Sequence, residues 1–139
     1  MKIIKICILV LVIALYSDFC NAQIFVNLAA KGANNGSSWE NAFTDLQNAL
    51  AAAKESDQIW IASGTYYPGQ TGASRSTTFL LTKGVEIYGG FQGSEINLSE
   101  RNSTKHPTTL SGDLNRDDII DNFNENRTDN VWSLMQVKK

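Results

Sequence analysis

Short β-rich runs recur along this chain, and the three central runs end at or near a glycine. Their spacing constrains the fold more than any other feature. The runs cover residues 24–27, 59–64, 85–90, 108–113 and 131–137. In the three central runs, Gly64, Gly89 and Gly112 are 25 and 23 residues apart. Self-similarity at a period of about 20–50 residues is typical of solenoids. The spacing therefore predicts a stack of similar coils.

Apolar residues alternate within the runs, which is typical of strands with one buried face. Ile59 and Ile61 share one face of their run, and Val85 and Ile87 share one face of theirs. In a parallel solenoid such side chains stack from coil to coil, and each buried aliphatic contributes about 1.5–3 kcal/mol. The alternative is an antiparallel sandwich, whose hairpins prefer about 2–5 connecting residues, whereas these runs are about 15–20 residues apart.

One segment has a helical period instead. Its apolar stripe consists of Leu46, Ala49, Leu50 and Ala53. Capping-box patterns precede it at Ser37 with Glu40 and at Thr44 with Gln47. These features predict a helix from Asp45 onward. Because a solenoid must cover the exposed end of its core, we expect this helix to be an N-terminal cap.

The first 22 residues have the features of a secretory signal peptide. Lys2 and Lys5 precede an apolar run, residues 6–16, that is too short for a membrane span of about 20 residues. Small side chains at Cys20 and Ala22 place the cleavage site before Gln23. Both cysteines of the chain lie in this segment. The expected product is an exported protein without a disulfide.

Several segments together resemble a known group of proteins. They are residues 24–27, 36–47, 59–68, 84–91, 98–102 and 108–113. The sequences of these segments and their order resemble the start of secreted bacterial right-handed parallel β-helix proteins, which have a pectin-lyase-like fold. This group shares members with the polymorphic outer-membrane-protein-like proteins. The resemblance implies an all-β, right-handed parallel β-helix solenoid of about four coils with an N-terminal capping α-helix. It also implies a protein secreted to, or held on, the outer surface of a bacterium.

The domain division that follows has three parts. Residues 1–22 are the signal peptide, 23–57 the N-terminal strand and capping helix, and 58–139 the β-helix coils. Chains of the group that this sequence resembles are usually several hundred residues long. We therefore expect the coils to be truncated at the C-terminus.

The acidic loop after Gly112 is a candidate metal site. Asp113, Asn115, Asp117 and Asp121 stand at the spacing 1, 3, 5 and 9 of an EF-hand calcium loop. Asp118 replaces the glycine of that motif and Asn124 replaces its final glutamate, so the match is partial. The sequence predicts a calcium ion here, with a solvated loop as the alternative, and no other cofactor.

Aromatic residues near the strand ends are candidate contacts for sugar rings. They are Trp60, Tyr66, Tyr67 and Tyr88. Aromatic rings stack on the apolar faces of sugars, but they are also ordinary strand formers and packing residues, so ordinary packing is the alternative. Partners expected on this basis are a polysaccharide or a cell-surface glycan, and the oligomeric state stays open.

Composition narrows the function further. The chain has 12 basic and 14 acidic residues, a net charge of −2, which excludes a polybasic nucleic-acid binder. After signal cleavage we expect no transmembrane span. No catalytic residue is nominated, because the lone His106 stands in a loop and no arginine lies beside an acidic pair within one strand. We expect a non-catalytic, adhesin-like or glycan-contacting scaffold; the alternative is the N-terminal fragment of a polysaccharide lyase or glycoside hydrolase whose catalytic coils are missing.

Overall fold

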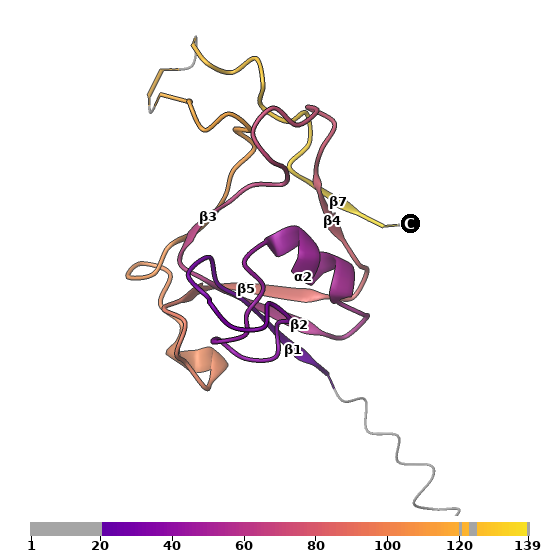
Figure 1. Cartoon of the computed structure of the whole chain (residues 1–139), viewed down its shortest axis with the longest axis vertical. Coiled ribbons are helices and arrows are strands. Elements are labelled where there is room, and N and C mark those ends of the chain that lie inside the picture. The colour runs from indigo at the N-terminus through magenta and orange to yellow at the C-terminus, as the bar shows by residue number, and fades with distance from the viewer. Residues whose placement is uncertain (1–20, 120, 123–124, 139) are drawn as a thin grey trace, which may run out of the picture.

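The computed structural model describes residues 21–119, 121–122 and 125–138. Nearly all of the expected signal peptide, residues 1–20, lies outside the described residues. The elements, in chain order, are β1 (Gln23–Val26), α2 (Leu46–Ala52), β2 (Gln58–Ala62), β3 (Gly64–Tyr66), β4 (Phe79–Leu81), β5 (Glu86–Phe91), the 3₁₀ turn η1 (Leu98–Glu100), β6 (Thr108–Leu110) and β7 (Met135–Val137) (Figure 1). In the described part of the chain, no helix has the length and apolar character needed to cross a membrane.

The strands pair in parallel and form three small sheets. Strands β1, β2 and β5 make a three-stranded sheet in that order, while β3 pairs with β6 and β4 pairs with β7. In the first sheet Ile24, Ile59 and Ile87 lie in register across the three strands. The apolar alternation of these runs therefore predicts correctly which side chains share a face.

The expected β-helix of about four coils is wrong. The run at 108–113 contributes β6, which pairs with β3 from Gly64 onward, and the run at 131–137 contributes β7, which pairs with β4. Neither strand joins the sheet of β1, β2 and β5. Alternating hydrophobicity indicates that a strand has one buried face, but it does not predict which strand pairs with it. The near-constant glycine spacing therefore did not define one continuous stack of coils.

The helix forms where its apolar stripe predicts, but its N-terminus is capped by a different residue from the one expected. Asp45 is the N-cap, and its Oδ1 accepts a hydrogen bond of 2.7 Å from the backbone N–H of Gln47. Thr44 instead directs its hydroxyl to Asn34, so the expected capping box at Thr44 does not form. The helix packs against β1 and β4, over one face of the three-stranded sheet (Figure 1). It is thus part of the core and not the end cap of a solenoid.

Both faces of the three-stranded sheet are covered by side chains. On one face the aliphatic core contains Val26, Ile59 and Ile61, packed with residues of α2 and with Phe79. On the other face an aromatic cluster consists of Phe25, Trp39, Trp60 and Phe91. The ring centroids lie 4.6 Å apart in Trp60 and Phe91, and 4.8 Å apart in Phe25 and Trp39. Four of the five residues of β2 are buried because both of its faces are packed.

Candidate functional site

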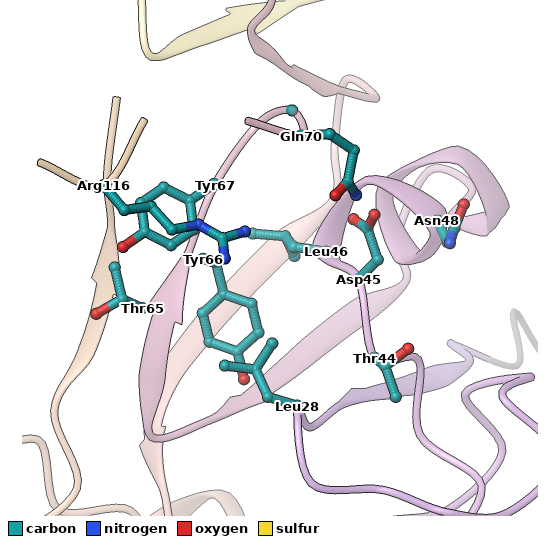
Figure 2. A pocket seen from close by; sticks show the side chains of 11 residues that line it. Leu28, Thr44, Asp45, Leu46, Asn48, Thr65, Tyr66, Tyr67, Gln70 and Arg116 are labelled. Carbon is teal, nitrogen blue, oxygen red and sulfur yellow. The ribbon is translucent and has the colours of Figure 1, made fainter. Parts of the chain in front are cut away.

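A cavity of about 440 Å³ opens between the start of α2, strand β3 and the acidic loop (Figure 2). Leu28, 48% exposed, gives it an apolar edge, and Leu46 and Tyr66 lie almost completely buried behind it. Its polar lining consists of Thr44, Asp45, Asn48, Thr65, Gln70 and Arg116. Binding pockets for small ligands combine apolar walls with a few placed polar groups, and this cavity has both.

An aromatic–cation pair forms one side of the cavity. Tyr67 follows β3 directly, and the Arg116 guanidinium carbon lies 4.6 Å from the centroid of its ring. Figure 2 shows the Arg116 side chain crossing Tyr67 and extending into the cavity toward Leu46. A guanidinium over an aromatic face is held by electrostatic attraction to the ring.

The loop that carries Arg116 is held by a buried carboxylate. Asp113 is 9% exposed, and its Oδ1 accepts hydrogen bonds from the backbone N–H groups of Arg116 and Asp117 at 2.7 and 3.2 Å. Its Oδ2 accepts a third bond, 3.0 Å, from the N–H of Asp118. Arg116 itself has a φ of 62°, in the left-handed region that is strained for a side chain with a Cβ. Asp113 therefore stabilises the backbone conformation that presents Arg116 to the cavity.

The predicted metal ligands come together only in part. Carboxylate oxygens of Asp113, Asp117 and Asp129 lie within 4.8 Å of one another. Asp117 and Asp113 belong to the predicted set, whereas Asp121 does not join this group. Asn115 contributes its backbone N–H, which donates to Asp129 Oδ2 at 2.7 Å. Sequence spacing within one loop could not reveal Asp129, because this residue lies outside the motif and only folding brings it beside Asp113 and Asp117.

Desolvation and the neighbouring carboxylates of this acidic cluster disfavour the charged form of Asp117. Partial desolvation, followed by the negative charges of Asp129 and Asp113, raises the pKa of Asp117. The buried carboxylate of Asp113 already accepts hydrogen bonds from backbone N–H groups, so it needs no bound ion to compensate for its burial. Calcium binding at this cluster stays a prediction.

Two of the predicted sugar contacts are packing residues. Trp60 is 4% exposed and stacks on Phe91 with an angle of 9° between ring planes. Tyr66 is 2% exposed, and its hydroxyl donates a 3.0 Å hydrogen bond to the carbonyl of Ala62. Burial, opposed in part by the backbone of Leu28, raises the pKa of Tyr66 to about 12. Neither ring presents an open face to a sugar.

The other two predicted aromatic contacts, Tyr67 and Tyr88, are half-buried and lie in different places. Tyr67 borders the cavity, whereas Tyr88 lies on β5, away from the residues that line it. The Tyr88 hydroxyl donates to Glu86 Oε2 at 3.0 Å, and this bond is the main cause that raises the pKa of Tyr88. Arg101 lies over the Tyr88 ring, 5.7 Å from its centroid.

One exposed aromatic residue was missed from the sequence. Trp132 is 75% exposed and lies beside Arg75, whose guanidinium carbon is 5.6 Å from the centroid of the indole ring. The run at 131–137 was expected to be a strand throughout, but β7 begins only at Met135. The polar stretch before Val131 was the available signal that Trp132 belongs to a loop.

The comparisons with known proteins find no relative. No family model, no curated protein and no solved structure matches the chain significantly. The resemblance to secreted bacterial proteins stays a prediction.

Proposed function

We propose that this chain is an exported or cell-surface module that binds carbohydrate without catalysing a reaction, with the cavity beside Tyr67 as its binding site. One observation carries the proposal: an open cavity that combines an aromatic ring, a guanidinium and several hydrogen-bonding side chains. An adhesin-like role, in which the module contacts a polysaccharide or a cell-surface glycan, fits a site of this kind.

The lining suits the chemistry of a sugar ring. A pyranose has an apolar face, which packs on aromatic and aliphatic groups, and a rim of hydroxyls, which need donors and acceptors. Tyr67 and Leu28 supply the first kind of surface, while Asn48 and Gln70 supply amide groups that both donate and accept. Asp45 adds a carboxylate that can accept hydrogen bonds from hydroxyls.

Export rests on the sequence. The signal peptide and the confinement of Cys7 and Cys20 to it support a protein that acts outside the cytoplasm. N-terminal sequencing of the protein recovered from the medium or envelope of an expressing bacterium tests this part. We expect the sequence to begin at Gln23, and a chain that retains Met1 would contradict export by cleavage.

The glycan test compares two tyrosines. The purified protein is applied to a glycan array, and the affinity for the best-bound oligosaccharide is then measured by calorimetry. Tyr67→Ala should weaken binding about tenfold or more, because aromatic anchors in a pocket commonly carry about 2 kcal/mol. Tyr88→Ala is the matched control and should stay within about twofold of the unmodified protein. Equal losses in both variants would contradict a site at the cavity.

The enzyme alternative, an N-terminal fragment of a lyase or glycoside hydrolase, stays a prediction. It needs catalytic residues outside this sequence, whereas the cavity of the described residues favours binding.

A further inference from the structure

Arg116 differs from the other arginines in what its guanidinium contacts. The chain has four arginines, and all lie in the described residues. Three of them engage protein oxygens: Arg75 with Asn130 O, Arg101 with Gly89 O, and Arg127 with Asp118 Oδ2. Within the described part of the chain, the Arg116 guanidinium has no hydrogen bond or ion pair and contacts the Tyr67 ring. Its N–H groups are therefore uncommitted.

The guanidinium of Arg116 is nevertheless held in place by its neighbours. Asp113 fixes the backbone of Arg116, and the Tyr67 ring lies against its guanidinium at 4.6 Å. Stacking covers one plane of a guanidinium and leaves its N–H edges free for hydrogen bonds. A planar fork of donors held in this way matches two oxygens of a carboxylate or of a sulfate, which bind arginine in a bidentate arrangement. Because the side chain is already positioned, less conformational entropy is lost on binding.

The geometry points to an acidic sugar as the ligand: we infer that the cavity selects glycans carrying a carboxylate or sulfate group, which binds to the Arg116 guanidinium. This inference rests on the proposed function and names the ligand class for the same site. Asp45, on the same cavity wall as Gln70 in Figure 2, repels a second anionic group there and accepts hydrogen bonds from hydroxyls instead. The site is thus suited to one anionic group beside Arg116 and neutral hydroxyls beside Asp45.

The surrounding charge requires this recognition to be a direct contact. Asp113, Asp117 and Asp129 lie in the same loop region, and the chain carries a net charge of −2. Long-range attraction therefore does not draw an anion to this protein, and binding depends on short-range hydrogen bonds to Arg116. Such contacts are less sensitive to salt than steering by a basic surface.

The test uses oligosaccharide pairs that differ only in charge. A glucuronate-containing oligosaccharide is compared with its carboxyl-reduced form, and a sulfated oligosaccharide with its desulfated form, by calorimetry on the purified protein. We expect at least one charged member to bind about tenfold or more tightly than its neutral counterpart, since hydrogen bonds to charged groups are the strong ones. The two pairs also show whether the carboxylate or the sulfate is preferred.

Variants of Arg116 test whether this residue causes the preference for charged oligosaccharides. Arg116→Ala should remove the difference between charged and neutral members, and Arg116→Lys should keep part of it, because lysine retains charge but not the planar fork. Arg101→Ala is the matched control, since Arg101 also lies over a tyrosine ring but away from the cavity. Thermal melts of all variants confirm that each is folded.

The outcomes separate the two proposals. Equal binding of charged and neutral members, or an unchanged preference in Arg116→Ala, overturns the inference about acidic sugars and leaves the carbohydrate site standing. Absence of binding by every glycan tested overturns both.

Discussion

Two tyrosine–arginine pairs in this protein look alike in isolation and differ in what surrounds them. Tyr67 with Arg116 and Tyr88 with Arg101 each combine a half-buried ring with a guanidinium, at 4.6 and 5.7 Å from the ring centroid. The second pair is engaged by its neighbours, because Tyr88 donates to Glu86 and Arg101 donates to Gly89. The first pair borders a cavity, and among the described residues its guanidinium has no hydrogen-bond acceptor. The contact itself is therefore a poor sign of a binding site; the uncommitted donors beside a cavity are the informative feature.

The difference has a local cause in the chain. Tyr88 lies in the middle of β5, two residues after Glu86, and alternate residues of a strand lie on the same face. A carboxylate is thus within reach of its hydroxyl. Tyr67 comes after the last residue of β3 and is followed by Pro68, where the chain leaves the sheet. Its ring meets a loop from a distant part of the sequence instead of its own strand.

The largest expected effect concerns the side of the sheet that carries Tyr88. Trp60 lies in register with Tyr88 on the neighbouring strand and stacks on Phe91. Trp60→Ala should lower the free energy of unfolding by about 3–5 kcal/mol, as is usual for a buried tryptophan. Urea denaturation measures the loss, with Tyr88→Ala as the half-exposed control. A Trp60→Ala protein as stable as the unmodified one would show that this ring is not a packing residue.

The next effect sharpens the role of the loop that carries Arg116. Asp113→Ala removes the acceptor of three backbone N–H groups and should cost about 3 kcal/mol of stability. It should also reduce glycan binding at the cavity, while the Tyr88–Arg101 pair is unaffected. Thermal melts with a chelator present, followed by calorimetry with the glycan, measure both consequences.

Asp117→Asn is the matched control for the acidic loop. The raised pKa of Asp117 means that its charged form is disfavoured in the folded state, so stability associated with this group falls as pH rises through its titration. Removing the charge should therefore leave the melting temperature unchanged or raise it at neutral pH. If Asp117→Asn destabilises as strongly as Asp113→Ala, the carboxylates act together and not through backbone bonds to Asp113.

A smaller effect concerns Tyr66, the buried ring of the cavity wall. Tyr66→Phe removes the hydrogen bond to Ala62 and should cost about 1 kcal/mol near neutral pH. Because the folded pKa is raised from 10.0 to about 12, the unfolded chain loses this proton first, and stability should fall as pH rises through that interval. The part of the alkaline decline that belongs to Tyr66 should be absent in Tyr66→Phe, as measured by denaturation at several pH values. An identical decline in both proteins would assign it to other groups.

Local sequence patterns predicted the helix and several strands of this fold, but they did not predict which strands pair with one another. The stripe of Leu46 and Leu50 located the helix, and the alternation at Ile59 and Ile61 located a buried strand, because both patterns depend on neighbours in the sequence. The pairing of β6 with β3 was not predictable from the glycine spacing, since several strands offer a similar apolar face.

The candidate site depends still more on contacts between distant residues. Tyr67 was identified as an aromatic contact, but its partner Arg116 comes from a loop far along the chain, and only folding brings the two together. The same is true of Asp129, which joins Asp113 and Asp117 from outside the motif that suggested a calcium loop. Trp60 and Tyr66 had the right chemistry for sugar contact, and burial removed them from that role.

The most direct test of the account is a calorimetric titration of Tyr67→Ala and Tyr88→Ala, side by side, with the glycan that the unmodified protein binds best. We predict that Tyr67→Ala loses about tenfold or more in affinity and that Tyr88→Ala binds within about twofold of the unmodified protein. Affinity that is retained in Tyr67→Ala and lost in Tyr88→Ala would contradict the central claim that the cavity beside Arg116 is the binding site.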